Sequence, residues 1–289
     1  MKELIEKANI LIEALPYIRT FYGKTFVIKY GGAAMTEDSL KNAFAQDIVL
    51  LSFIGIRPII VHGGGQKISS AMEKMGKKPM FVHGQRITDK ETMNIVEMVL
   101  GGLINKEIVN LINTNGGRAV GLSGKDAGLI TAKKKTIKKP SAKAVDLGLV
   151  GKVEKVEPLI LENLQAGNFI PVIAPIGVSR KGETLNINAD LVASSIASAI
   201  RAEKLIFLTD TQGIMDKKGV VIGTLDKKKI ERLTKDGVIS GGMMPKVESC
   251  LDALMAGVSK THIIDGRIPH SLLIEIFTDK GIGTEIIRL

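Results

Sequence analysis

Tryptophan is missing from this chain of 289 residues, and aromatic residues make up only 4% of it, whereas hydrophobic residues reach 45%. A core of this composition must be built mostly from Ile, Leu, Val, Ala and Met. The single cysteine, Cys250, cannot form an internal disulfide, and no Cys/His spacing indicates a zinc site. Both features favour a reducing compartment, and we expect a cytoplasmic protein.

Long apolar runs are also missing, because no uninterrupted segment approaches the roughly 20 residues that span a membrane. Residues 1–24 contain Glu3, Glu6 and Glu13 and no small-residue cleavage site follows them, so they do not fit an export signal. Their apolar residues fall on one helical face and predict an amphipathic helix that Pro16 breaks or kinks. These residues are Leu4, Ile5, Ala8, Leu11, Ile12 and Leu15.

Basic residues are in excess and give a formal net charge of +10. The densest basic run, residues 133–139, has no interleaved aromatic residues that stack on bases. It favours a solvated β-hairpin or flap, with a nucleic-acid-binding arm as the alternative. A positive balance also suits small anionic substrates, which positive clefts attract. We therefore expect neither a nucleic-acid partner nor a membrane partner.

Strand-like apolar runs alternate with helical patterns from residue 25 onward. The strand candidates include TFVIKY, RPIIVH, RAVGLSG, FIPVIAPIGV, KLIFLTD and KTHIIDG. The alternation predicts an α/β fold with a mostly parallel sheet and helices on both of its faces. We expect a helical extension over residues 1–24, a first lobe over 25–201 and a second lobe over 202–289.

Ligands of such sheets bind at the carboxyl ends of the strands. Glycines follow two of the expected strands here, as Gly31-Gly32 and as Gly63 to Gly65. Their backbone N–H groups can approach an anion closely, although a turn without a ligand remains the alternative. The segment IIVHGGGQKI lacks the third glycine of the dinucleotide-binding fingerprint GxGxxG. The segment GLSGKD lacks the first glycine and the final Ser or Thr of the P-loop. We therefore expect neither a Rossmann dehydrogenase nor a P-loop ATPase.

Two lysines accompany these glycines. Lys29 lies inside an apolar strand, as either an exposed edge-strand lysine or a charge placed at a strand end. Lys246 follows Gly241, Gly242 and Pro245 near an expected helix start. The positive end of a helix is a poor place for a structural lysine and a reasonable one for a lysine that faces phosphate.

Polar residues introduce an Ala- and Ser-rich helical segment at Asn186, Asn188 and Asp190. One of them can be an N-cap, but three within five positions exceed what a cap needs. Arg86, in the segment HGQRITD, has a planar guanidinium that suits a substrate carboxylate, with an exposed loop arginine as the alternative.

Taken in order, IKYGG, VHGGG, HGQRITD, NINAD, LTDTQGIMD and GGMMPK resemble the amino acid kinase superfamily and, within it, the acetylglutamate kinases. The resemblance spans nearly the whole chain. It implies an open three-layer α/β/α sandwich whose first lobe binds N-acetyl-L-glutamate and forms dimers, and whose second lobe binds ATP. The implied reaction is phosphorylation of the γ-carboxylate with MgATP in arginine biosynthesis. A kinase for a carrier-protein-linked aminoadipate is the alternative.

The resemblance also implies a role for each candidate. Lys29 and Lys246 would stabilise the transferring phosphoryl group, Asp190 would hold both ammonium groups, and Arg86 would pair with the substrate α-carboxylate. The γ-carboxylate is already ionised, so no catalytic base is needed. No side chain is assigned to a metal, because Mg²⁺ would ride mainly on ATP. The remaining assignments are Gly32 and Gly64 for the phosphoryl group; Gly64, Gly65 and Asn186 for acetylglutamate; and Gly31, Gly32, Asp210, Gly242, Met243 and Lys246 for the nucleotide.

Arginine-sensitive members of this family carry an N-terminal helix that interlaces dimers into a hexamer, a trimer of dimers. The resemblance therefore implies a hexamer and feedback inhibition by L-arginine. For the apolar face of the N-terminal helix, docking on its own lobe is the alternative to packing on a partner's helix. The implied effector site consists of Tyr17, His262, Glu275, Gly281 and Gly283, and Glu275 would pair with the arginine guanidinium.

Overall fold

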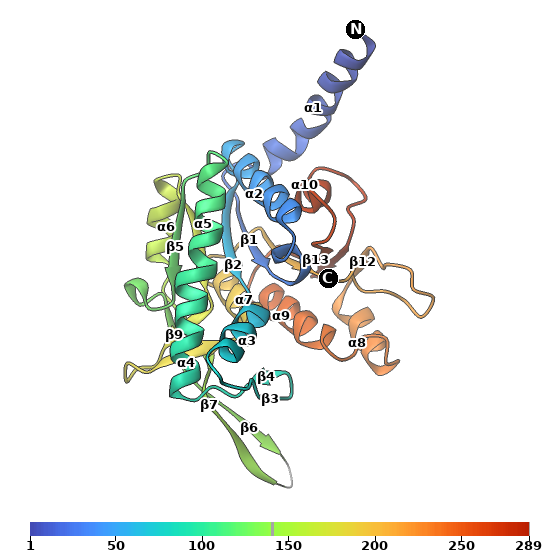
Figure 1. The fold of residues 1–289 in the computed structure, drawn as a ribbon. Helices are drawn as coiled ribbons and strands as arrows, with labels where there is room; N and C mark the ends of the chain where they lie inside the picture. Colours follow the sequence, from blue (N-terminus) through green and yellow to red (C-terminus); the bar gives the residue numbers. More distant parts are fainter. Residues whose placement is uncertain (140–141, 289) are drawn as a thin grey trace.

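An eight-stranded sheet forms the middle layer of this computed structural model, which describes residues 1–139 and 142–288 (Figure 1). The strands from β13 to β5 run parallel, whereas β14 is antiparallel to β13. The expected mostly parallel, open sheet is confirmed. In spatial order the strands are β12 (Thr224–Leu225), β14 (Thr284–Ile287), β13 (Lys260–Asp265), β11 (Lys204–Thr209), β1 (Thr25–Tyr30), β2 (Arg57–His62), β8 (Ile170–Ala174) and β5 (Ala119–Ser123).

Helices cover both faces of this sheet and complete the three layers. Alternation along β1 shows why, since Phe26 and Ile28 belong to one core and Val27 belongs to the other. One face is covered by α2 (Asp38–Phe53), α3 (Gly65–Lys74), α4 (Lys90–Glu97), α5 (Asn105–Thr114) and α10 (Ser271–Ile276). The other is covered by α6 (Leu159–Ala166), α7 (Ala189–Ala199), α8 (Lys227–Lys235) and α9 (Met243–Met255).

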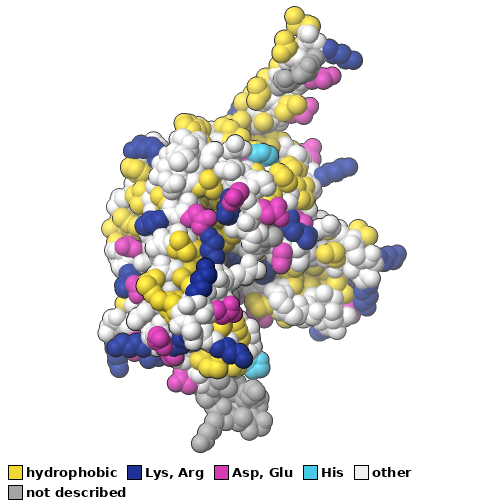
Figure 2. Space-filling view, in the orientation of Figure 1, with side chains coloured by type: hydrophobic (Ala, Val, Ile, Leu, Met, Phe, Trp, Pro, Cys, Tyr) yellow, Lys and Arg dark blue, Asp and Glu magenta, His cyan; other side chains and the backbone are white. Residues whose placement is uncertain are grey.

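The first helix, α1 (Lys2–Phe21), continues through Pro16, so a break at that residue is wrong. Its C-terminal end packs on the body, where the Tyr17 and Phe277 rings meet edge to face. The rest points away from the body and carries exposed hydrophobic side chains (Figures 1 and 2). Docking of this part on its own lobe is therefore not observed. The exposed residues are Leu4, Ile5, Ile10, Leu11, Ile12 and Leu15.

A second, smaller sheet holds the basic run predicted to form a hairpin. Its strands are β6 (Ile130–Lys139), β7 (Ala142–Val156), β9 (Ile176–Val178) and β10 (Thr184–Ile187). The β6–β7 hairpin extends below the body beside a short hairpin of β3 (Phe81–Val82) and β4 (Gln85–Arg86) (Figure 1). The segment FIPVIAPIGV is not one strand, because it divides at Pro175 between the two sheets.

A π-helical turn, η2 (Met98–Ile104), joins α4 to α5 within the long helical stretch. Two short 3₁₀ turns, η1 (Gly32–Met35) and η3 (Asp126–Gly128), follow strands β1 and β5. In the described part of the chain, no helix is both long enough and apolar enough to cross a membrane.

Candidate active site

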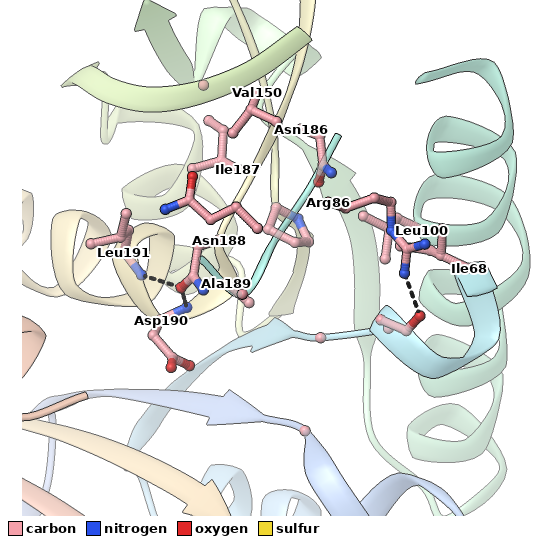
Figure 3. Close-up of a pocket in the computed structure, with 18 of the residues that line it drawn as sticks. Ile68, Arg86, Leu100, Val150, Asn186, Ile187, Asn188, Ala189, Asp190 and Leu191 are labelled. Atoms are coloured by element: carbon pink, nitrogen blue, oxygen red, sulfur yellow. Dashed lines mark hydrogen bonds between the residues drawn. The ribbon is translucent and has the colours of Figure 1, made fainter. Parts of the chain in front are cut away.

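A cavity of about 360 Å³ opens at the carboxyl ends of the central strands (Figure 3). Such a volume suits a small molecule. The glycines after β1 and β2 form one wall, and the segment leading into α7 forms another. Candidate residues that line it are Lys29, Gly31, Gly32, Gly64, Gly65, Arg86, Asn186, Asp190 and Lys246.

Two lysines meet one carboxylate at the floor of the cavity. Lys29 Nζ lies 3.1 Å from Asp190 Oδ1, and Lys246 Nζ donates to Asp190 Oδ2 at 2.8 Å. Lys29 is only 9% exposed, because β1 lies between β11 and β2, so the edge-strand interpretation is wrong. A buried charge needs a partner, and Asp190 from α7 supplies it.

The charge state of Asp190 follows from its surroundings. Burial would raise its pKa, but the ammonium groups of Lys29 and Lys246 outweigh burial, and the pKa lies below its usual value. The carboxylate is therefore ionised at neutral pH. Two ammonium groups and one carboxylate leave one net positive charge, which favours an anionic ligand.

The three polar residues before α7 have different tasks. Asn188 is the N-cap, since its Oδ1 accepts hydrogen bonds from the backbone N–H groups of Asp190 and Leu191 at 2.8 and 3.2 Å (Figure 3). Asn186 Nδ2 donates to Thr88 Oγ1 at 3.3 Å. All three residues line the cavity, and Asn186 and Asp190 are not needed as caps.

Close approach accounts for Gly64. Its backbone is extended, so no unusual conformation requires glycine there, but a Cβ atom would lie 2.5 Å from Ile104 Cδ1 and 2.6 Å from Leu100 Cδ2. The π-helical turn η2 supplies both of these side chains. Gly64 is also the N-cap residue of α3, whose backbone N–H groups can bind an anion.

His62 holds this glycine turn in place. Its Nδ1 donates to the Gly63 carbonyl oxygen at 2.9 Å, and its Nε2 accepts from Asn105 Nδ2 at 3.3 Å. Burial lowers the pKa of His62 to about 4, so the imidazole is neutral at physiological pH. These contacts give His62 a structural task.

Arg86 lies across the cavity from Asp190 (Figure 3). It is buried and donates to Gly65 O and Ser69 Oγ, both at 2.8 Å, and its guanidinium lies 4.7 Å from the centre of the Phe81 ring. Among the described residues, none offers it a carboxylate. Arg86 is thus no exposed loop residue, and its positive charge is left to match an anion.

A second hollow of about 590 Å³ is lined by Met243, at the start of α9, and by residues between 211 and 238. Thr211 contributes a buried Oγ1 that has no hydrogen-bond partner among the described residues, as expected if a polar ligand completes the hollow. Asp210 and Gly242 line neither hollow, although the Asp210 backbone N would be 3.6 Å from a Cβ atom on Gly32. Sequence patterns did not indicate a role for Thr211.

The expected effector residues gather away from the cavity. His262 Nδ1 lies 2.7 Å from Glu275 Oε1, and the other oxygen of Glu275 accepts from the Ile282 backbone N–H at 2.8 Å. Lys204, which sequence patterns did not indicate, donates to His262 Nε2 at 2.9 Å. Burial lowers the pKa of His262, while Glu275 acts in the opposite direction.

The other expected effector residues surround this cluster. A Cβ atom on Gly281 would lie 2.6 Å from Glu275 Oε2. Gly283 follows one residue after Ile282, and a Cβ atom there would lie 2.3 Å from Ile263 O. No described contact joins Tyr17 to His262 or Glu275. Its hydroxyl donates to Asp279, on the segment that leads to Gly281.

A model of the amino acid kinase family matches residues 24–265. The chain belongs to this family. An acetylglutamate kinase from Nitrosomonas eutropha is 56% identical over 283 residues, which are 97% of this chain and 96% of the relative. Another from Syntrophobacter fumaroxidans is 55% identical over 290 residues, covering 99% and 97%. The predicted family and its fold are confirmed.

Solved structures of similar proteins have the same fold. An N-acetylglutamate synthase from Neisseria gonorrhoeae, complexed with coenzyme A and N-acetyl-glutamate, matches with a TM-score of 0.86 and 27% identity. The match covers 98% of this chain but 63% of the synthase chain. A carbamate kinase from Giardia lamblia bound to AMP-PNP matches with a TM-score of 0.62 at 16% identity, over 92% of this chain and 99% of that one, which shows the fold alone.

Proposed function

We propose that this amino acid kinase transfers the γ-phosphoryl group of MgATP to the γ-carboxylate of N-acetyl-L-glutamate and forms N-acetyl-L-glutamyl 5-phosphate, in arginine biosynthesis. The observation that carries the chemistry is the meeting of Lys29 and Lys246 at Asp190 beside the glycine turns. The choice of substrate is supported by the acetylglutamate kinases that match nearly the whole chain.

The reaction needs charge stabilisation more than proton transfer. An oxygen of the γ-carboxylate attacks the γ-phosphorus, the bond from that phosphorus to the β–γ bridging oxygen breaks, and ADP leaves with the electron pair. The attacking carboxylate is already ionised at neutral pH. Lys29 and Lys246 offset the negative charge of the moving group, and Asp190 keeps both ammonium groups aligned.

Acetylglutamate is assigned to the first lobe, residues 25–201. Arg86 pairs there with its α-carboxylate, because Arg86 is buried and has no carboxylate partner among the described residues. Asn186 and the backbone of Gly64 and Gly65 complete this end of the cavity.

The nucleotide is assigned to the second lobe, residues 202–289. Its base and ribose are assigned to the hollow at Thr211 and Met243. The Thr211 hydroxyl, which has no partner among the described residues, can hydrogen-bond to the nucleotide there. Asp210 and Gly242 directly precede Thr211 and Met243 in the sequence. Gly31 and Gly32 line the active-site cavity with Lys29 and are assigned to the nucleotide's phosphates. Mg²⁺ would neutralise phosphate charge and is assigned to the nucleotide's own phosphates, since no cluster of three or more His, Cys, Asp or Glu residues suits a metal in the described parts.

Trapping of the acyl phosphate with hydroxylamine tests this function. Purified protein is incubated with MgATP and with N-acetylglutamate, glutamate or aspartate, each with and without L-arginine. Hydroxamate formed with N-acetylglutamate alone is the expected result. Equal product from free glutamate, or no product from any acceptor, would contradict the proposal.

Inhibition by L-arginine and assembly into a hexamer belong to the same proposal. The Lys204, His262 and Glu275 cluster places a carboxylate beside the segment that holds Gly281. The structural neighbour from Neisseria gonorrhoeae has also been solved with L-arginine. The exposed apolar face of α1 offers a surface for another copy of the chain. Light scattering tests the hexamer, and a monodisperse dimer would contradict it.

A further inference from the structure

Lys135 of β6 lines the active-site cavity together with Lys29 and Lys246. Its two predecessors on the strand do not. Lys133 lies 3.7 Å from Glu154 and Lys134 lies 2.8 Å from Glu183, and none of these four residues lines the cavity. Of the three consecutive lysines 133–135, the first two are exposed and the third lines the cavity.

The pairing of the hairpin is irregular at Lys135. Lys134 pairs with Gly151 and Thr136 pairs with Asp146, so the register of β6 on β7 shifts across Lys135. Four residues of β7 (147–150) therefore lie opposite Lys135 alone, and bulges are frequent beside active sites. Regular alternation alone would not predict which lysine faces the cavity.

The surroundings of Lys135 favour a negatively charged ligand. The residue is half-buried, and no described carboxylate lies within ion-pair distance of it. Burial lowers its pKa, Lys152 lowers it further, and Glu248 of α9 acts in the opposite direction. Lys135 and Lys246, which belongs to α9, line the same cavity.

The side-chain charges of the cavity leave room for a further cation. The α-carboxylate of acetylglutamate is matched by Arg86, and Asp190 cancels one of the two floor lysines. One net positive charge then remains for a nucleophilic carboxylate and a phosphoryl group that both carry negative charge. Mg²⁺ offsets part of this negative charge, and a third lysine that lines the same cavity can offset more.

We propose that Lys135 is a phosphate-binding residue of this site, whose ammonium group contacts the terminal phosphate oxygens of the bound nucleotide from the β6–β7 hairpin. The proposal rests on the kinase function proposed above. It assigns to the hairpin a direct part in binding MgATP, in addition to its structural pairing with β7 and β9.

The test compares Lys135→Met, which keeps the length of the side chain without its charge, with Lys135→Arg and with Lys134→Met as a matched control. Steady-state kinetics with MgATP and N-acetylglutamate varied in turn separates the two substrates. Equilibrium titration with MgAMP-PNP, and separately with N-acetylglutamate, measures binding without turnover. Unfolding midpoints show whether each variant keeps its stability.

For Lys135→Met we expect kcat/KM for MgATP to fall at least tenfold and the affinity for MgAMP-PNP to fall at least fivefold. The affinity for N-acetylglutamate should change less than twofold. Lys135→Arg should recover part of the loss, and Lys134→Met should match the wild type.

Two results would overturn the proposal while the wild-type enzyme is active. One is wild-type kinetics and nucleotide binding in Lys135→Met, and the other is a loss confined to N-acetylglutamate. A wild-type protein that forms no acyl phosphate would instead refute the proposed function, and nucleotide titration of Lys135→Met would still decide whether Lys135 binds phosphate.

Discussion

Lys246 Nζ lies 2.8 Å from Asp190 Oδ2, and this ion pair ties the first turn of α9 to the first turn of α7. Lys29 of β1 reaches the other oxygen of the same carboxylate. The two lysines therefore share one anchor, although they come from opposite halves of the chain. Their spacing is set by Asp190 before any substrate enters, which is the preorganisation that charge stabilisation requires.

Removal of either lysine should leave a folded but slow enzyme. For Lys29→Ala and Lys246→Ala we expect kcat to fall about a hundredfold, because loss of one preorganised contact raises the barrier by about 3 kcal/mol. Lys235→Ala, at an exposed position of α8, should be unaffected. Circular dichroism checks folding, and unchanged turnover in one lysine variant would remove that residue from the mechanism.

Gly64→Ala should distort the acetylglutamate end of the cavity through packing. The new Cβ atom would meet Leu100 and Ile104 at 2.6 and 2.5 Å, so the glycine turn or η2 must shift. We expect KM for acetylglutamate to rise at least tenfold, and Leu100→Ala combined with Ile104→Val to restore part of it. Gly65→Ala should leave the unfolding midpoint unchanged, because its Cβ atom would meet open space. Additive effects of Gly64→Ala and the double variant would show that packing is not the cause.

Asp47 of α2 should make stability fall as pH rises. Burial raises its pKa from 3.8 to about 6, against a 2.6 Å contact with His270 Nδ1. The folded state therefore holds this proton more tightly than the unfolded chain. The stabilisation is complete below pH 4 and is lost as pH rises through 6, by on the order of 3 kcal/mol.

Asp47→Asn has no such proton to lose. Relative to the wild type, its free energy of unfolding in urea should increase between pH 4.5 and 7. Glu73→Gln, at an exposed position of α3, should follow the wild type at every pH. A parallel pH dependence of Asp47→Asn and the wild type would contradict the prediction.

Glu275→Gln should separate inhibition from catalysis. Glu275 lies in the His262 cluster, outside the active-site cavity, so kcat and both KM values should stay within twofold. The concentration of L-arginine for half-inhibition should rise at least tenfold, because a neutral amide no longer pairs with a guanidinium. Glu285→Gln, whose carboxylate pairs with Lys260, is the control. Full inhibition of Glu275→Gln at wild-type concentrations of arginine would exclude it from the effector site.

The strands and most helices follow from periodicity, because each central strand is a short apolar run bounded by turn residues. Sequence periodicity could not say which strand lies at an edge, and this left Lys29 with two interpretations. The structure decides between them only through pairing with β11 and β2, which are distant in sequence. Pro175 is similar, since an apolar run gives no sign that it passes from one sheet to another.

The site was predictable where a motif fixes the local backbone and unpredictable where side chains meet across the fold. The glycine turns and the segment NINAD could be found by reading the sequence. Lys204, Thr211 and Lys135 could not be found in this way. Lys204 is identified by its contact with His262, Thr211 by its unpaired hydroxyl in the second hollow, and Lys135 by its place at the register shift between β6 and β7. The division of work between Asn186 and Asn188 also needed coordinates, since either can cap a helix.

The π-helical turn η2 makes the shape of the substrate cavity depend on the length of a helix. A π turn holds more residues than an α turn, and here it contains Gly101 and Gly102. Deleting one of these glycines would remove the extra residue of the π turn and shorten the spacing between Leu100 and Ile104 from four residues to three. Leu100 and Ile104 would then no longer both lie against Gly64. Deletion of a glycine that does not line the cavity would thus change the cavity wall at Gly64.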